Sequence, residues 1–306
     1  FEEGLVNLYL PDLAVPLLSS TDDPTETFED IMSKLNSLVG LSEIKQKVAE
    51  HARYLEFLQI RRSKGFKETE KINIHSVFTG NPGTGKTTVA KMMGKLYRKM
   101  GLLSKGHVTE VDRVDLVGEY IGQTAPKTKE VIEKARGGVL FIDEAYALAR
   151  TNDDTKDFGR EVIEILVKEM SNGKGDLAVI VAGYPREMKH FIHSNPGLRS
   201  RFKHFYEFQD YLPQDLVQIA LQSAEQREIK FTPESFEILK EIITAAYRER
   251  DKTFGNARYV QDLLDKAKLN MALRLMSRKN PKKLSHAELS EVQVADVLSL
   301  RPAALV

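Results

Sequence analysis

The sequence predicts an α/β domain, in which helices cover both faces of a parallel sheet, followed by a smaller all-helical domain. Short apolar runs rich in β-forming residues alternate with helical patterns, and they span residues 75–79, 108–111, 139–142 and 177–182. Strands that are apolar on both faces and separated by helices are typical of a buried parallel sheet. After Asp210 no further convincing strand pattern appears, which favours a helical domain there.

Length, charge and composition narrow the function classes. The 306 residues suffice for one large and one small domain, each with its own core. With 45 Lys and Arg against 44 Asp and Glu, the net charge is +1, which argues against nucleic acid or an anionic membrane as partner. The longest apolar stretch, residues 5–18, is interrupted by polar residues and prolines and is too short to span a membrane. The absence of cysteine excludes disulfides and thiol catalysis and fits a reducing compartment, so we expect the cytoplasm, or the stroma of a plastid.

The predicted elements follow in order along the chain. Residues 1–33 contain eight acidic residues, three prolines and no Lys or Arg, which predicts an acidic arm or linker. Apolar residues at helical spacing between Ile31 and Leu58, broken by a turn at 39–41, predict two helices before the first strand. In the helical domain, Thr232 followed by a proline predicts the start of one helix, and Asn256 is expected to cap another.

A glycine loop between the first strand and the next helical pattern carries the most specific signal. Residues 80–87 read GNPGTGKT, which matches the phosphate-binding pattern GxxxxGK[ST] between a strand and a helix. Lys86 is expected to bridge the β- and γ-phosphates of ATP, and the Thr87 hydroxyl to bind Mg²⁺. An accidental glycine-rich turn is the alternative, and the flanking strand and helix disfavour it. The residues expected to contact the nucleotide are Gly80, Asn81, Pro82, Gly83, Thr84, Gly85, Lys86, Thr87 and Thr88.

Two acidic residues end the apolar strand at 139–142. A buried strand often ends in polar residues, so Asp143 and Glu144 alone would indicate little. A phosphate-loop ATPase, however, needs a carboxylate from a second strand at its Mg²⁺ ion. We therefore assign Asp143 to the metal and Glu144 to the attacking water, as general base.

These motifs, together with residues 116–131 and 138–146, resemble the CbbX/SpoVK branch of the AAA+ ATPases, which includes the red-type Rubisco activases. The resemblance covers about residues 35 to 275. It implies an AAA+ nucleotide-binding domain at 34–210, and a helical lid with a C-terminal tail at 211–306. It also implies a homo-oligomeric ring, taken as a hexamer, that acts on a protein client as a chaperone-like motor.

The resemblance also assigns residues outside the phosphate loop. Tyr120, Ile121 and Gly122 match a pore loop that presents an aromatic side chain to a threaded polypeptide, although Tyr120 could instead pack within its loop. Arg201 matches an arginine finger that reaches the γ-phosphate of the neighbouring subunit, with Arg199 assisting. A planar, permanently charged guanidinium suits that contact, and an ordinary surface salt bridge is the alternative.

Two further positions concern the sensors of the nucleotide. Arg258 matches the sensor-two arginine of the lid, which binds the nucleotide, and pairing with Asp262 one turn later is the alternative. Many AAA+ proteins place Asn or Thr at sensor one, whereas this chain has Tyr184 near that position. We assign Tyr184 no catalytic role.

The sequence thus predicts an ATP-driven ring motor that remodels a protein by threading it through a pore. The resemblance to red-type Rubisco activases suggests the large subunit of Rubisco as its client. A SpoVK-like ATPase with another client and a nucleotide-dependent assembly switch are the alternatives. A nucleic-acid motor is disfavoured by the balanced charge and by an aromatic pore loop.

Overall fold

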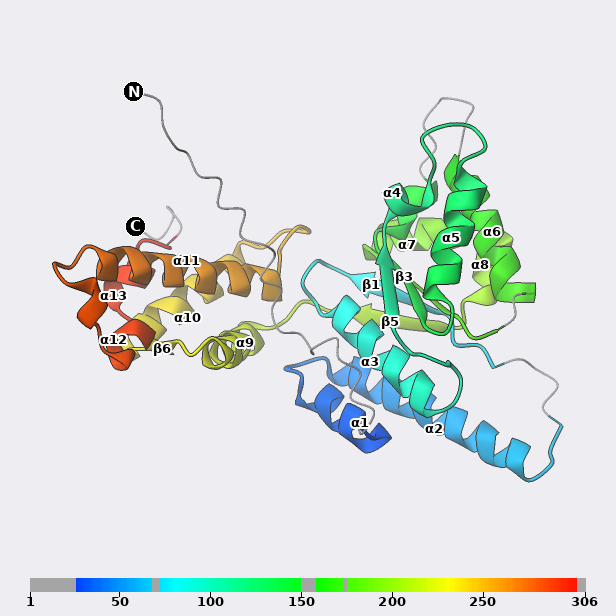
Figure 1. Ribbon diagram of the computed structural model, residues 1–306, viewed down its shortest axis with the longest axis horizontal. Helices are drawn as coiled ribbons and strands as arrows, with labels where there is room; N and C mark the ends of the chain where they lie inside the picture. The colour runs from blue at the N-terminus through cyan, green and yellow to red at the C-terminus, as the bar shows by residue number, and fades with distance from the viewer. Residues whose placement is uncertain (1–25, 68–71, 150–157, 173–174, 302–306) are drawn as a thin grey trace.

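The computed structural model describes residues 26–67, 72–149, 158–172 and 175–301. The fold consists of an α/β layer, in which helices cover a parallel sheet, and a C-terminal helical layer, and the segment that follows residue 208 joins the two (Figure 1). Residues 1–25 of the predicted acidic arm and residues 302–306 of the predicted tail lie outside the described residues. Among the described helices, none is long and apolar enough to cross a bilayer.

Five parallel strands form the central sheet, in the order β2-β3-β4-β1-β5. They are β1 (Ser76–Gly80), β2 (Val108–Val111), β3 (Val139–Ile142), β4 (Ala178–Gly183) and β5 (His204–Phe208). The first four coincide with the predicted runs to within one residue. The sequence pattern does not predict β5, because this edge strand alternates exposed and buried residues instead of being apolar throughout.

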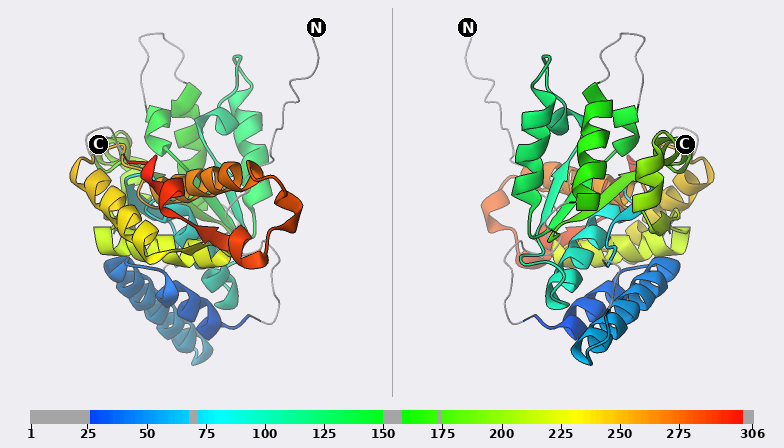
Figure 2. Two further views of the ribbon diagram at one scale, coloured as in Figure 1. Left: turned by 90° about the vertical axis from the view of Figure 1, so that its left-hand side faces the viewer. Right: turned by 90° about the vertical axis from the view of Figure 1, so that its right-hand side faces the viewer.

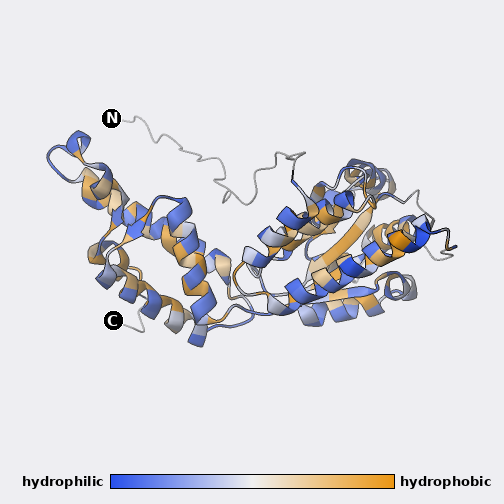
Figure 3. Ribbon diagram, turned by 90° about the horizontal axis from the view of Figure 1, so that it is seen from below, coloured by the Kyte–Doolittle hydropathy of each residue, from blue (hydrophilic) through white to orange (hydrophobic). Residues whose placement is uncertain are grey.

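Alternate residues of each strand supply two separate cores. Phe78 and Phe141 point into one core, whereas Val77 and Leu140 point into the other. The first core is closed by α1 (Phe28–Ser37), α2 (Ser42–Ser63) and α3 (Lys86–Lys99). The second is closed by α4 (Arg113–Leu116), α5 (Thr124–Ala135), α6 (Phe158–Asn172), α7 (Pro185–His193) and α8 (Pro196–Arg201). Figure 2 shows the two groups of helices on opposite faces, and Figure 3 shows apolar strands between helices of mixed polarity.

The C-terminal layer has a third core of its own. The layer consists of α9 (Pro213–Gln226), α10 (Pro233–Arg248), α11 (Ala257–Met276), α12 (His286–Ser290) and α13 (Val294–Leu298). As predicted, Thr232 caps α10 by accepting a hydrogen bond from the Ser235 N–H, and a proline occupies the first turn. The layer also contains a two-residue parallel strand pair, β6 (Lys230–Phe231) and β7 (Glu291–Val292), which the sequence pattern does not predict. The predicted, predominantly helical character of the C-terminal layer is confirmed.

The predicted cap at Asn256 is wrong in its chemistry. Asn256 stands at the N-cap position of α11, but its side chain makes no capping hydrogen bond to that helix. It reaches across to other segments instead, because its backbone adopts an unusual conformation, with φ 48° and ψ −120°, in a fully buried position.

Candidate active site

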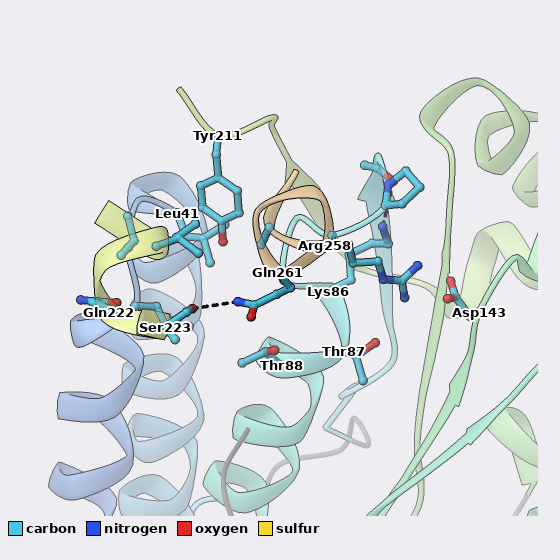
Figure 4. A pocket seen from close by; sticks show the side chains of 18 of the residues that line it. Leu41, Lys86, Thr87, Thr88, Asp143, Tyr211, Gln222, Ser223, Arg258 and Gln261 are labelled. Carbon is cyan, nitrogen blue, oxygen red and sulfur yellow. Dashed lines mark hydrogen bonds between the residues drawn. The ribbon is translucent and has the colours of Figure 1, made fainter. Parts of the chain in front are cut away.

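A pocket of about 350 Å³ opens between the carboxyl edge of the sheet and the helical layer (Figure 4). This is the edge at which parallel α/β sheets bind their ligands, and the volume suits a nucleotide-sized molecule. The predicted site residues that line it are Gly80, Pro82, Gly83, Gly85, Lys86, Thr87, Thr88, Asp143, Glu144 and Arg258. The glycine loop after β1, the acids after β3 and the start of α11 therefore meet in one place.

The glycine loop is shaped by backbone conformations that favour glycine. Gly83 and Gly85 have φ values of 69° and 95°. A Cβ atom on Gly83 would lie 1.9 Å from the carbonyl oxygen of Gly255, so a larger residue would push the loop away from the helical layer. Two members of the predicted set do not line the pocket: Thr84 is fully buried, and the Asn81 side chain turns towards Asp210.

Lys86 begins α3 and lies inside the pocket. Its Nζ atom donates hydrogen bonds to the carbonyl oxygens of Gly80 at 2.9 Å and Asn81 at 2.7 Å. Burial lowers the pKa of Lys86 from 10.5 to about 8, and the Arg258 charge lowers it further while the nearby carboxylates, Asp143 foremost, oppose the shift. The ammonium is thus a partly desolvated cation, which interacts more strongly with a phosphate than an exposed lysine does.

The acidic pair lies on a strained turn at the end of β3. Glu144 has φ 47°, which is unusual for a residue other than glycine, and its N–H donates to the Asp143 carboxylate at 3.0 Å. Such strain is concentrated at functional sites, where the surrounding structure holds the residue in place. The turn directs both carboxylates towards the same pocket as Lys86 and Thr87.

Thr87 and Asp143 offer the hard oxygen ligands that Mg²⁺ prefers. Among the described residues, no group of three or more His, Cys, Asp and Glu side chains could hold a metal. Mg²⁺ is usually bound through one or two protein ligands together with water and substrate phosphates. The Thr87 hydroxyl also donates to Glu110 of β2 at 3.3 Å, and this third acid near the pocket was not identified from the sequence.

The helical layer closes the other side of the pocket. Arg258, in the first turn of α11, lines it, and within the described residues it forms no ion pair with Asp262. Tyr184 also lines the pocket, and burial, followed by the charge of Glu144, raises the pKa of its hydroxyl. Gln261 of α11 donates to the Ser223 hydroxyl of α9 at 2.8 Å, which joins the two helices at the pocket wall.

The two predicted arginine-finger residues do not contribute to this pocket. In the described part of the chain, Arg201 and Arg199 are absent from its lining. Arg201 ends α8, and its Nε atom donates to the Ser171 hydroxyl at 2.6 Å. Arg199 is exposed. Neither arginine therefore lines the pocket of its own subunit in the described part of the chain.

The predicted pore loop is also remote from the pocket. Tyr120 and Ile121, between α4 and α5, are 67% and 71% exposed, so the alternative of a tyrosine packed within its loop is wrong. The base of the loop is held by a buried hydrogen bond from the Gly118 N–H to the Thr124 hydroxyl at 3.1 Å. An anchored loop thus presents two large apolar side chains to solvent.

Several of the residues that line the pocket were not identified from the sequence, because the segments that contain them matched other structural patterns. Residues 39–41 were identified only as a turn and Leu38 only as part of a helical pattern, yet Leu38, Val39 and Leu41 line the pocket. The residues of the helical layer were missed as well, since helical spacing gives no sign of which turn faces a ligand. They are Tyr211, Ile219, Gln222, Ser223, Gln226, Ala257 and Gln261.

Comparison with family models supports a two-part ATPase. Residues 76–210 match the model of the ATPase family associated with various cellular activities (AAA), and residues 212–302 match the AAA lid domain. Among solved structures, the Holliday junction branch migration motor RuvB of Thermotoga maritima is similar, with a TM-score of 0.56 and 18% identity. The match covers 87% of this chain and 70% of that one, and it shows the fold alone.

Curated relatives are much more similar in sequence. The protein CbbX of Cereibacter sphaeroides is 45% identical over 81% of this chain and 80% of its own length. Stage V sporulation protein K of Bacillus subtilis is 43% identical over 81% of this chain and 76% of its own. The chloroplastic ribulose bisphosphate carboxylase/oxygenase activase of Cyanidioschyzon merolae is 41% identical, with coverages of 89% and 92%.

Proposed function

Since the chain belongs to the CbbX, CfxQ and SpoVK group of AAA ATPases and so hydrolyses ATP, we propose that it is a ring motor that uses this energy to thread a protein client. Such a motor needs a nucleotide site, a neighbouring subunit that responds to it, and a surface that grips the client. The pocket supplies the first of these, and the exposed segments described above are candidates for the other two.

The chemical step is assigned to the residues that converge on the pocket. Lys86 binds the phosphates, Glu144 orients and deprotonates the attacking water, and Arg258 binds the nucleotide from the lid. Mg²⁺, held by Thr87 and Asp143, would neutralise charge on the phosphates. These roles fit the shared lining of one pocket and the strained turn that aims Glu144 into it.

The ring is supported by the position of Arg201. A guanidinium that lies outside its own pocket can complete the pocket of a neighbour only in an assembly of head-to-tail contacts, which close into a ring. AAA ATPases are typically oligomeric, and we take the hexamer as the working state. In this scheme hydrolysis requires two subunits, because one supplies Lys86 and Glu144 and the next supplies Arg201.

The observation that carries the motor assignment is the exposed, anchored loop with Tyr120 at its tip. An aromatic side chain on such a loop can hold many polypeptides, because apolar and stacking contacts need no specific sequence. An assembly switch would not require it. The comparisons leave the client open, since identities to CbbX and to stage V sporulation protein K are 45% and 43%. We propose a red-type Rubisco large subunit as the first client to test, and a different client remains the alternative.

The test compares Tyr120→Ala and Tyr120→Phe in two assays. The first is basal ATP turnover, and the second is reactivation of red-type Rubisco that is inhibited by a bound sugar phosphate. Tyr120→Ala should keep basal turnover and lose reactivation, whereas Tyr120→Phe should retain most of both, since the role needs an aromatic surface and no hydroxyl. Tyr54→Ala is the matched control, because Tyr54 is a similarly exposed tyrosine, at 57%, on α2.

The outcomes separate the client from the motor. Normal reactivation by Tyr120→Ala would exclude threading by this loop. If the unaltered protein does not reactivate the carboxylase, Rubisco is excluded as client, and stimulation of ATP turnover by an unfolded polypeptide such as casein then tests the motor. A protein whose turnover responds to neither would be a switch.

A further inference from the structure

Asp210 lies where β5 gives way to the helical layer, and its carboxylate receives hydrogen bonds from both sides of that junction. From the glycine loop, Asn81 Nδ2 donates to the two carboxylate oxygens at 2.9 and 3.1 Å. From the lid, which is the C-terminal helical layer, Asn256 Nδ2 donates to Oδ1 at 2.8 Å. The Arg250 Nε atom lies 3.6 Å from Oδ2 and adds a weaker ion pair. One half-buried carboxylate thus joins the glycine loop to the lid.

The Asn256 side chain makes two further contacts across this junction. Its amide nitrogen also lies 3.2 Å from the Pro82 carbonyl of the glycine loop, and its side-chain oxygen accepts a hydrogen bond from the Tyr211 N–H at 3.0 Å. The residue is fully buried and has a positive φ of 48°, a conformation that asparagine tolerates better than most other side chains. These contacts account for its failure to cap α11.

The backbones on either side of these side chains are also in direct contact. The Ala257 N–H donates to the Gly83 carbonyl at 3.2 Å, and a Cβ on Gly83 would overlap Gly255. Because Ala257 is the first residue of α11, this contact sets where the helix begins relative to the glycine loop. Arg258 is the next residue, so the position of its guanidinium depends on the same contact.

We propose that Asp210, Asn81 and Asn256 form a hinge latch, which holds the lid against the glycine loop and thereby positions Arg258 at the nucleotide. The three are positioning residues, since Asp210 and Asn256 do not line the pocket in the described part of the chain and act through Arg258 and the loop. The inference deepens the proposed function, as it rests on the pocket being the ATP site. Without the latch the lid can move away from the glycine loop. Part of the free energy of nucleotide binding must then be used to close the lid, which lowers the affinity.

Hydrogen bonds to a charged carboxylate are the strongest that uncharged side-chain donors form. Asp210→Ala removes the acceptor for two amides at once. Asn81 loses the carboxylate that its side chain binds, whereas Asn256 Nδ2 keeps the Pro82 and Phe254 carbonyls. Asp210→Asn retains one oxygen and removes the charge, so its effect should be intermediate. The loss in Asp210→Ala should weaken ADP binding by about tenfold, the range expected for one such bond.

The experiment measures the distance between the two layers and the affinity for nucleotide in the same protein. Because the chain has no cysteine, Lys129→Cys on α5 and Lys279→Cys beyond α11 can carry a donor and an acceptor dye without other changes. Both positions are exposed. Without nucleotide, Asp210→Ala should broaden the distribution of transfer efficiencies, and saturating ADP should restore it, because ligand binding favours the closed state. Titration of a fluorescent ADP analogue gives the affinity.

The controls separate a latch from a general loss of structure. Asp215→Ala removes another half-buried carboxylate nearby, in the first turn of α9, which accepts a hydrogen bond from the Leu212 N–H and does not contact Asn81 or Asn256. It should leave both the distance and the affinity unchanged. Asn81→Ala combined with Asp210→Ala should be no worse than Asp210→Ala alone, since both remove the same bond.

Three results would overturn the latch. They are an unchanged distance distribution in Asp210→Ala, an ADP affinity within twofold of the unaltered protein, and additive effects of the two substitutions. Failure of the proposed function is recognised separately, because the unaltered, dye-labelled protein would then bind no nucleotide while its distance distribution could still respond to Asp210→Ala.

Discussion

Lys86 should make ATP binding depend on pH in the mildly alkaline range. Burial lowers its pKa from 10.5 to about 8, and Arg258 adds to the shift while Asp143, Asp210 and Glu144 oppose it. Phosphate groups bind the protonated ammonium, and their negative charge raises the pKa of Lys86 in the complex. Below pH 8 the ammonium is already charged and the affinity should be constant. Above pH 8 binding requires uptake of a proton, so the affinity falls as pH rises.

The size of the effect follows from the fraction of Lys86 that is neutral. With a pKa of about 8 in the free protein, the dissociation constant for ATP should rise about eightfold between pH 7.5 and pH 9. Above pH 9 the dissociation constant should rise about tenfold with each pH unit, until the pKa of Lys86 in the ATP complex is reached. An unburied lysine would give no change in this range.

The assay is titration of ATP into Glu144→Gln, which is expected to bind ATP without hydrolysing it. Calorimetry in two buffers that differ in ionisation enthalpy measures the proton uptake directly. Lys86→Arg should abolish both the uptake and the slope, because a guanidinium stays charged at these pH values. Lys91→Met, a change on the same helix at a residue outside the pocket lining, should leave them intact. A constant dissociation constant, or a slope that persists in Lys86→Arg, would refute the reasoning.

Three further outcomes are expected. Lys86→Ala should abolish ATP binding, whereas Glu144→Gln should keep binding and lose turnover. Equilibrium binding and phosphate release measure the two properties. Normal turnover in Glu144→Gln would exclude Glu144 as the base. Lys86→Ala and Arg201→Ala subunits should each be inactive alone. An equal mixture of the two should recover about a quarter of the turnover of the unaltered protein, because one interface in four combines an intact site with an intact finger. Full activity of Arg201→Ala alone would contradict this. Arg274→Ala should lower the free energy of unfolding by about 3 kcal/mol in a urea titration. It removes the cationic partner of Asp296, a carboxylate 1% exposed and bonded to Arg274 at 2.7 and 2.8 Å, and leaves the hydrogen bond from the Gln293 N–H. A loss below about 1 kcal/mol would show that Asp296 does not require the Arg274 charge.

Local patterns predicted the parts of the fold and site that depend on neighbouring residues. The inner strands were found because burial on both faces makes them apolar almost throughout. The edge strand β2 was found from its β-branched residues, whereas the edge strand β5 alternates exposed and buried residues and was missed. The glycine loop and the acids after β3 were found because their chemistry is encoded within a few consecutive residues. The domain boundary at residue 210 and the roles of the site residues stay predictions.

Contacts between distant segments could not be predicted in the same way. Glu110, 23 residues from Thr87, comes near it only through the pairing of β2 with β3 in the sheet. Asn256 does stand at the N-cap position of α11, as predicted, but its side chain does not form the predicted capping hydrogen bond. A single sequence offers no signal that its amide would instead reach Asp210, 46 residues away.

The distribution of these contacts bears on how a nucleotide could drive movement. The phosphate-binding lysine and the acids belong to the α/β layer, Arg258 belongs to the lid, and Arg201 lies outside the pocket altogether. In the proposed function ATP touches Lys86, Arg258 and the Arg201 of a neighbouring subunit, so it would bind tightly only when the two layers and that subunit are correctly oriented. Loss of the γ-phosphate would then remove the contact that unites them. Only a ligand with different affinities for the two arrangements can shift the balance between them. The division of the site among separate bodies would supply that difference. The exposed loop at Tyr120 lies between α4 and α5 of the α/β layer, so in the proposed motor it would move together with that layer.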